Sequence, residues 1–173
     1  MKYLFFILLI VFTSCSAQKI ESFKNKTPKL TLEKYFQGKV QGTGVFFDRF
    51  SNLRRSFVVE IEGSVTGDIL NLKEVLTYDD GEVVKRTYVI KKYSDNLYQA
   101  EANGVVGLAE IKSYGNALQW KYRLKQKIGK SDWTLAFDDW MYLQPTGIIL
   151  NRAQVTKFGL NVGEVLMSIK RLE

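Results

Sequence analysis

The feature that most constrains the fold of this chain is a period of two in its hydrophobic pattern, repeated between closely spaced turn signals. Phe57, Val59 and Ile61 alternate with largely polar neighbours, and the run from Leu118 to Leu124 does the same. Such alternation is typical of β-strands with one buried face and one solvated face. Turns rich in glycine, asparagine and aspartate separate the runs, and no helical pattern lies between them to build parallel crossovers.

The sequence therefore predicts an all-β fold, an antiparallel up-and-down meander. A sheet of about 8–10 strands tends to curl and close, so a closed or nearly closed barrel is favoured over a sandwich. One short helix is expected over residues 31–36, with Thr31 as its N-cap. No repeat or second linker follows, so residues 31–173 are assigned to a single domain.

The first fourteen residues have the layout of a secretory signal. Lys2 supplies a positive charge, residues 3–12 form an unbroken apolar run, and small residues follow. A helix needs about 20 apolar residues to cross a bilayer, so this run is too short to be a permanent anchor. Residues 1–14 are therefore predicted to be a signal peptide.

Cys15 is the only cysteine in the chain, so no intramolecular disulfide can form. The stretch from Phe12 to Cys15 resembles the bacterial lipobox, which implies that Cys15 is acylated and becomes the mature N-terminus. Phe12 departs from the leucine that is usual there. The alternative is cleavage near Ala17, which would leave a soluble periplasmic protein. Residues 15–30 are polar and lysine-rich and are expected to form a flexible tether between the lipid and the barrel.

The expected location is the outer membrane, facing the periplasm, because Ser16 is not the aspartate that resembles an inner-membrane retention signal. The chain has 25 Lys and Arg against 18 Asp and Glu, a net charge of +7. Outside the cytoplasm a basic surface suits phosphate-bearing lipids or polyanionic glycans rather than nucleic acid, or serves only solubility. The expected partners are a membrane, through the N-terminal lipid, and a lipid-like ligand; the oligomeric state is left open.

Charged residues fall on the apolar face of a predicted hairpin. With residues 79–81 as a three-residue loop, Glu74 lies opposite Arg86 and Leu72 opposite Tyr88, all on one side of the sheet. A carboxylate and a guanidinium are thus expected to meet in the barrel interior.

A second hairpin suggests a similar pair. With residues 144–147 as a four-residue loop, Asp139 lies opposite Arg152. Both pairs could be internal ion pairs that fix strand register, because buried charge is tolerated when it is paired. Alternatively Glu74, Arg86, Asp139 and Arg152 are interior polar contacts for an amphiphilic ligand.

Aromatic residues on the same faces could form the wall of a cavity. A hairpin at Gly115-Asn116 places Ala109 opposite Tyr122 and Ile111 opposite Trp120. Small residues facing large ones can mean an interlocked core or an open pocket. The candidate pocket-lining residues are Tyr88, Trp120, Tyr122 and Trp140.

Several chemistries are set aside by composition. The chain contains no histidine, so a Ser-His-Asp arrangement is impossible, and zinc or copper would lack their usual ligands. An acylated Cys15 leaves no thiol nucleophile. No catalytic residue, metal or cofactor is therefore expected, although Glu74 and Asp139 could in principle act as an acid–base pair.

A further set of motifs carries a family resemblance. They are Gly42–Arg49, Glu74, Tyr78–Glu82, Arg86, Gly115–Ala117, Tyr122–Leu124, Asp138–Met141, Asn151-Arg152 and Lys157–Gly159. In this order they make the chain, over about residues 35 to 170, similar to a bacterial family of lipoproteins, the domain of unknown function DUF3833. The resemblance implies lipid attachment and a lipocalin-like barrel and gives no activity. Leu76 and Tyr88 depart from the expected phenylalanine and tryptophan, which affects the size of any cavity.

The sequence thus favours a non-enzymatic, lipid-anchored envelope protein whose barrel binds an amphiphilic or lipid-like ligand. One alternative is a solid barrel whose outer surface recruits an envelope partner. The other is an acid–base hydrolase.

Overall fold

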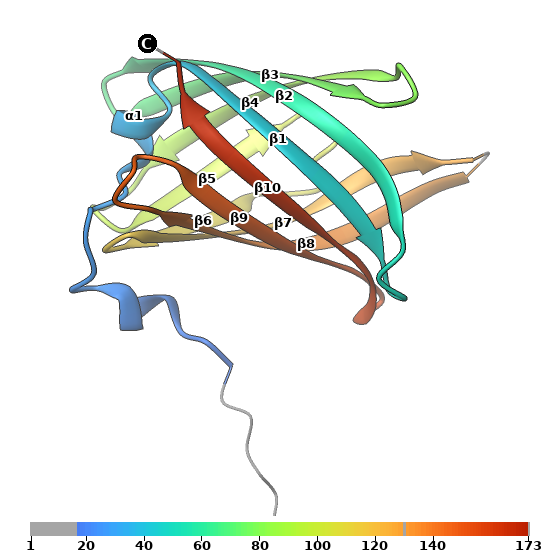
Figure 1. The fold of residues 1–173 in the computed structure, drawn as a ribbon. Helices are drawn as coiled ribbons and strands as arrows, with labels where there is room; N and C mark the ends of the chain where they lie inside the picture. The colour runs from blue at the N-terminus through green and yellow to red at the C-terminus, as the bar shows by residue number, and fades with distance from the viewer. Residues whose placement is uncertain (1–16, 130, 173) are drawn as a thin grey trace, which may run out of the picture.

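The fold is a closed barrel of ten antiparallel strands. The computed structural model describes residues 17–129 and 131–172, so the predicted signal peptide and Cys15 lie outside the described residues. Each strand pairs with the next along the chain, and β1 pairs with β10 to close the barrel (Figure 1). The strands are β1 (Gly38–Asp48), β2 (Leu53–Thr66), β3 (Ile69–Tyr78), β4 (Val83–Lys92), β5 (Leu97–Ala102), β6 (Ala109–Tyr114), β7 (Ala117–Ile128), β8 (Ser131–Leu143), β9 (Ile149–Lys157) and β10 (Leu160–Arg171). The predicted all-β meander is confirmed.

The alternating pattern determines which side chains form the core. On β2, Phe57, Val59 and Ile61 point inward and are at most 8% exposed, whereas Val58 between them is 42% exposed on the outer surface. Successive side chains of a strand point to opposite faces, so one face of every strand contributes to a shared interior.

One end of the barrel is closed by α1 (Leu32–Tyr35), seen at the left in Figure 1. Leu32 and Phe36 are buried, and the hydroxyl of Tyr35 lies 2.9 Å from the carbonyl oxygen of Ile169 on β10. A side chain at Gly63 on β2 would collide with the Phe36 carbonyl, so glycine permits this close approach. The short helix expected over 31–36 is present; Thr31 is its N-cap, but its side chain makes no capping hydrogen bond.

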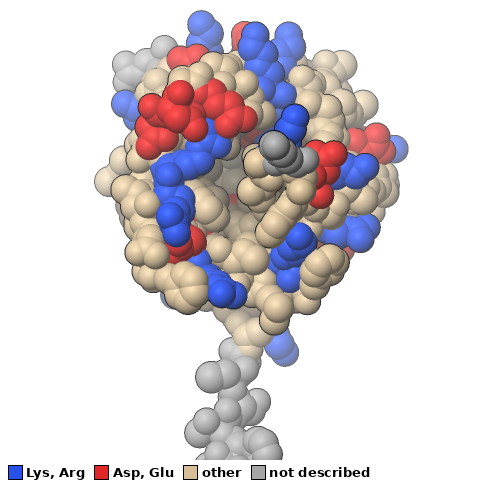
Figure 2. Space-filling model, turned by 90° about the vertical axis from the view of Figure 1, so that its right-hand side faces the viewer, with Lys and Arg blue, Asp and Glu red and all other residues tan. Residues whose placement is uncertain are grey.

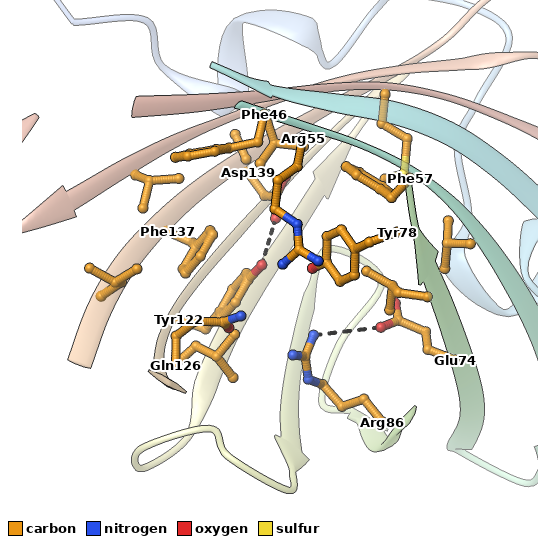
Figure 3. A pocket seen from close by; sticks show the side chains of 18 of the residues that line it. Phe46, Arg55, Phe57, Glu74, Tyr78, Arg86, Tyr122, Gln126, Phe137 and Asp139 are labelled. Carbon is orange, nitrogen blue, oxygen red and sulfur yellow. Dashed lines mark hydrogen bonds and ion pairs between the residues drawn. The ribbon is translucent and has the colours of Figure 1, made fainter. Parts of the chain in front are cut away.

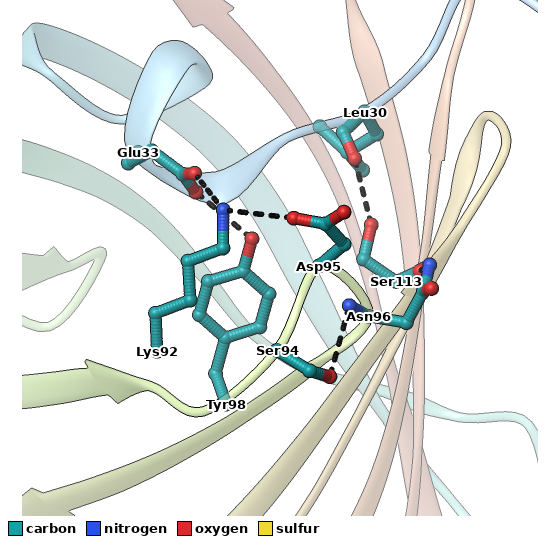
Figure 4. Close-up of polar contacts among 8 residues, drawn as sticks. All are labelled: Leu30, Glu33, Lys92, Ser94, Asp95, Asn96, Tyr98 and Ser113. Carbon is teal, nitrogen blue, oxygen red and sulfur yellow. Dashed lines mark hydrogen bonds and ion pairs between the residues drawn. The ribbon is translucent and has the colours of Figure 1, made fainter. Parts of the chain in front are cut away.

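Polar contacts attach α1 and the residues before it to the barrel wall (Figure 4). Lys92 Nζ lies 2.8 Å from Glu33 Oε1, and the Tyr98 hydroxyl donates to Glu33 Oε2 at 2.9 Å. Ser113 Oγ donates to the buried Leu30 carbonyl at 2.7 Å. These contacts reach β4, β5 and β6, so the helix is held by tertiary contacts rather than by its own four residues.

The chain before α1 differs from the flexible tether expected over 15–30. In its described part it packs against the outside of the barrel, where η1 (Ile20–Phe23) places the Phe23 ring 6.3 Å from the Trp140 ring, centroid to centroid. Ile20 and Leu30 are buried, and the Leu30 amide donates to the Gly115 carbonyl. The few apolar residues of a largely polar segment are sufficient to dock it. None of the helices in the described ranges is long and apolar enough to span a membrane.

Candidate binding cavity

The barrel is hollow in the half remote from α1. A cavity of about 490 Å³ opens between the β1–β2, β3–β4 and β7–β8 connections, and Figure 2 looks into this opening. Its wall is mostly apolar and includes Phe57, Leu76, Phe137, Met141 and Met167. Small-molecule sites commonly measure about 300–1,000 Å³. The space therefore suits a small ligand and counts against the solid-barrel alternative.

The cavity ends where large aliphatic side chains fill the barrel near α1. Leu72, Ile90, Ile111, Leu118 and Ile149, from five different strands, are each at most 1% exposed. They form a packed layer between α1 and the cavity. One half of the barrel is thus a solid core and the other half a chamber.

The predicted pair of Glu74 and Arg86 lies in this chamber (Figure 3). β3 and β4 pair in the expected register, Glu74 with Arg86 and Leu72 with Tyr88. Arg86 Nη1 is 3.7 Å from Glu74 Oε2 and donates to the Tyr88 hydroxyl at 3.2 Å. Burial raises the pKa of Glu74 to about 7; the charge of Arg86 opposes the rise, and that of Asp139 adds to it. Glu74 therefore changes its protonation state near neutral pH.

The second predicted pair is wrong, because the β8–β9 register differs from the expected one by one residue. Leu143 pairs with Ile149, so Asp139 faces Ala153 rather than Arg152. Arg152 points outward, where its Nε donates to Glu164 at 2.8 Å. A one-residue shift turns every side chain of a strand to the other face.

The reason lies in the turn. The Gln144 amide donates to the Ile148 carbonyl, and Gly147 has a φ of +81°, which makes residues 145–147 a three-residue loop. The β3–β4 turn has the same arrangement, with Tyr78 bonded to Glu82 and Gly81 at a φ of +84°. Both are hairpins in which the third loop residue takes the left-handed conformation.

Asp139 is nevertheless an interior residue with other partners. Asn151 Nδ2 donates to its Oδ1 at 2.6 Å, and the Tyr122 hydroxyl donates to its Oδ2 at 3.1 Å. Burial raises the pKa of Asp139 to about 6, and these two hydrogen bonds oppose the rise. The sequence analysis did not place Asn151 in the interior, because Asn151 faces inward only in the observed register.

Three of the four aromatic candidates line the cavity. Tyr88 and Trp120 meet edge to face with ring centroids 5.1 Å apart, and Tyr122 stacks on Phe137 at 4.9 Å. Ile111 pairs with Trp120 as expected. The buried Trp120 Nε1 has no hydrogen-bond partner among the described residues. The prediction that Trp140 lines the cavity is wrong, because its side chain points outward and packs on Phe23.

Arg55 at the cavity mouth is a second residue that the sequence analysis missed. Its guanidinium lies 3.5 Å from the centroid of the Tyr78 ring (Figure 3). Its Nη2 is 2.7 Å from Asp80 Oδ1 and 2.9 Å from Glu82 Oε2. Arg55 continues the inward-facing series of Phe57 and Val59, so the alternation of β2 contained the signal.

Sequence comparison places the chain in a family. Residues 9–171 match the family described as protein of unknown function, DUF3833. The chain belongs to this family. No curated protein matches this DUF3833 chain.

Two solved structures share the fold of the DUF3833 chain. The S-type phycobiliprotein lyase CPES from Guillardia theta has a TM-score of 0.60 and 10% sequence identity, over 90% of this chain and 99% of the lyase. A protein of unknown function from the DUF3598 family of Nostoc punctiforme has a TM-score of 0.58 and 11% identity, over 85% of this chain. The match covers 51% of the Nostoc protein, so the DUF3833 chain spans about half its length. At these identities the likeness concerns the fold alone.

The cavity of the DUF3833 chain combines apolar area with a few polar groups. In its interior the polar groups include those of Glu74, Arg86, Tyr122, Asp139 and Asn151, and Arg55 lies at the mouth. In the described part of the chain, no group of three or more Asp, Glu, His or Cys side chains is arranged to hold a metal ion. The arrangement can bind a molecule that is apolar along most of its length and carries hydrogen-bonding atoms at one end.

Proposed function

We propose that this DUF3833 protein binds an amphiphilic, lipid-like molecule inside its barrel. The supporting observation is the cavity of about 490 Å³, open at one end and apolar over most of its wall. Along β3, Glu74 comes next to the packed layer at Leu72, whereas Leu76 and Tyr78 lie nearer the mouth. The polar end of the ligand therefore lies deep, beside Arg86, and the apolar chain extends toward the opening.

The proposal includes the attachment of the protein to the bacterial envelope. Acylation of Cys15 would hold the barrel at the outer membrane, on its periplasmic side. Each buried CH₂ contributes about 0.8 kcal/mol, so more than one acyl chain gives stable anchoring. Cys15→Ser should release the protein from the membrane fraction. A Cys15→Ser protein that remains membrane-bound would count against lipid attachment.

Ligand binding can be tested with a fluorescent fatty acid such as parinaric acid. Leu76→Trp adds bulk to the cavity wall and should weaken binding by about tenfold or more, which corresponds to 1.4 kcal/mol. The matched control is Val89→Trp, which adds the same side chain on the outer face of β4, where Val89 is 46% exposed. Native mass spectrometry of the gently purified protein would identify the natural ligand. Equal binding by the two variants, or no binding by the wild type, would contradict the proposal.

An acid–base hydrolase is the second candidate function, and one observation favours it. Glu74 and Asp139 face the same open cavity, and burial raises the pKa of both toward neutrality, to about 7 and about 6. A hydrolase would release a cleaved ligand from the wild type, while the Glu74→Gln variant would retain the intact molecule. Recovery of the same intact ligand from both proteins would exclude this role.

A further inference from the structure

Four large apolar side chains are exposed together at one side of the cavity mouth. Phe50 is 69%, Leu53 56%, Phe158 93% and Leu160 71% exposed, and we call these four residues the rim patch. Phe50 and Phe158 lie in the β1–β2 and β9–β10 connections, and Leu53 and Leu160 are the first residues of β2 and β10. The two connections lie next to each other at the lower right of Figure 1 because β1 pairs with β10. Grouped exposure of this kind marks an interaction surface more often than isolated apolar residues do.

The backbone at Phe158 is unfavourable for a bulky residue. Phe158 and Gly159 form a two-residue turn between the paired residues Lys157 and Leu160, with φ values of +52° and +80°. Turns with two positive φ angles favour asparagine followed by glycine, and a bulky side chain in this conformation is an outlier. Neither turn geometry nor packing within the barrel accounts for a phenylalanine that is 93% exposed.

Positive charges accompany the aromatic rings of the rim. The guanidinium carbon of Arg49 lies 4.6 Å from the centroid of the Phe50 ring. Lys157 Nζ lies 5.4 Å from the centroid of Phe158 and 3.1 Å from that of Trp133 on β8. Figure 2 shows Lys and Arg side chains around the opening with acidic side chains among them, and the largest acidic group lies at the upper left.

The largest acidic group of the mouth belongs to the β3–β4 turn, which lies across β1 and β2 from the β9–β10 connection. Asp79, Asp80 and Glu82 lie there, and Arg55 pairs with the last two. The rim-patch side also holds Asp48, but Arg54 pairs with this carboxylate at 2.6 Å, and Arg49 and Lys157 add positive charge. This side of the mouth is therefore apolar and basic, and the side of the β3–β4 turn is acidic. A negatively charged surface would meet the first side and be repelled by the second.

We propose that the rim patch docks on a membrane that contains anionic phospholipids. The side chains of Phe50, Phe158 and Leu160 would enter the head-group region, while Arg49 and Lys157 contact lipid phosphates. Basic residues near a membrane surface contribute about 1 kcal/mol each, and apolar insertion adds to this. The patch consists of protruding loop tips rather than a concave groove, which suits a soft lipid surface. Docking turns the mouth toward the bilayer and does not depend on whether the cavity binds a ligand.

Vesicle sedimentation of a chain that begins at Ser16 and carries no acyl group tests the proposal. The described core lies between Ile20 and Ile169, so this chain retains every described core contact. It should sediment with vesicles of equal parts phosphatidylglycerol and phosphatidylcholine, and more weakly with phosphatidylcholine alone. The double variant Phe158→Asn with Leu160→Ser should bind about tenfold more weakly or worse. Asparagine suits the turn, so this change removes the ring without disturbing the hairpin.

The matched control lies at the closed end of the barrel. Tyr93 is 55% exposed, and Lys91 Nζ is 5.2 Å from the centroid of its ring, so the pair resembles those of the rim. Tyr93→Asn should leave vesicle binding unchanged. Arg49→Gln combined with Lys157→Gln should remove the preference for phosphatidylglycerol.

Two results would overturn the proposal. In the first, the unsubstituted chain that begins at Ser16 stays in the supernatant with both kinds of vesicle. The rim patch would then be assigned to contact with a protein partner instead of a membrane. The other is an equal loss of binding in Tyr93→Asn and in the rim variant. Leu76→Trp should bind vesicles like the wild type, so failure of ligand binding in the cavity and failure of membrane docking are separate outcomes.

Discussion

The two ends of the barrel differ in how far their large apolar side chains are exposed to solvent. At the closed end Leu30, Leu32 and Phe36 are at most 2% exposed, because the residues before β1 fold across that end of the barrel. At the open end Phe158 and Leu160 are 93% and 71% exposed. A closed-end turn also carries an exposed ring, that of Tyr93 at 55%, but it is a single side chain, whereas four large apolar side chains are exposed together at the mouth. It is this grouping, rather than exposure by itself, that distinguishes the open end.

The two halves of the barrel interior also differ in composition. Near α1 the barrel is filled by aliphatic side chains such as Leu118 and Ile149, which stabilise the fold through burial. Nearer the mouth it holds Glu74, Arg86 and Asp139, whose desolvation opposes folding. Stability should therefore come mainly from the closed half and ligand recognition from the open half. Four predictions test this difference.

The largest effect is expected from α1, the helix that closes one end of the barrel. Leu32 is fully buried, so Leu32→Ala should lower the free energy of unfolding by about 2–5 kcal/mol. The same substitution at the exposed Leu160 should change it by about 0.5 kcal/mol or less. Urea denaturation of the two variants at one pH measures both values. Similar losses at both positions would contradict the division of the barrel into a stabilising and an open half.

A pH-dependent effect is expected from the chamber. The pKa of Glu74 rises from its ordinary 4.5 to about 7 in the folded chain because the carboxyl is buried. The folded state therefore binds this proton more tightly than the unfolded state does. The resulting stability is fully present below about pH 4.5 and is lost as the pH rises through 7. At 1.36 kcal/mol per pKa unit the loss over this interval amounts to about 3–4 kcal/mol.

Glu74→Gln removes this titration, so urea unfolding at pH 5 and pH 8 should show a smaller difference for the variant than for the wild type. Asp139 still titrates in both proteins, which leaves a common residual slope. Glu60→Gln, on the outer face of β2, is the matched control and should behave like the wild type. An unchanged difference in Glu74→Gln would show that Glu74 is well solvated in the open chamber.

A smaller effect is expected where the N-terminal segment meets the wall. Ser113 is buried and donates to the Leu30 carbonyl at 2.7 Å, so Ser113→Ala should cost about 1–2 kcal/mol by leaving that carbonyl without its donor. Ser64→Ala, at an exposed position of β2, should be nearly neutral. Thermal unfolding of both variants distinguishes the two. A neutral Ser113→Ala would indicate that water replaces the hydroxyl.

Local rules were enough to predict the architecture from the sequence. Alternation gave the strands, and the Asp79-Asp80-Gly81 turn gave the β3–β4 register, which placed Glu74 opposite Arg86. The same rule applied to Pro145-Thr146-Gly147 would have given the true β8–β9 register. A loop counted one residue too long placed Arg152 inside the barrel and left Asn151 out.

Other features depend on contacts that no local pattern contains. The segment before α1 is polar in composition, and it docks because Phe23 meets the outward-facing Trp140, which lies far away in the sequence. The volume of the cavity depends likewise on how inward side chains from ten strands meet. Alternation identifies those side chains but does not show whether they touch.

The smallest expected effect concerns the turn at Phe158. Asparagine adopts positive φ angles more readily than phenylalanine, so Phe158→Asn should leave stability unchanged or raise it by about 0.5 kcal/mol. Phe158→Ala, which removes the ring without supplying a residue that favours the turn, should be less stable than Phe158→Asn. Thermal unfolding at one pH ranks the three proteins. If Phe158→Asn is clearly less stable than the wild type, the ring supports the barrel itself, and its exposure no longer argues for membrane docking. If Phe158→Asn is as stable as the wild type or more stable, the phenylalanine does not contribute to the stability of its own turn. This result is expected of a side chain that is retained for contact with a partner rather than for folding.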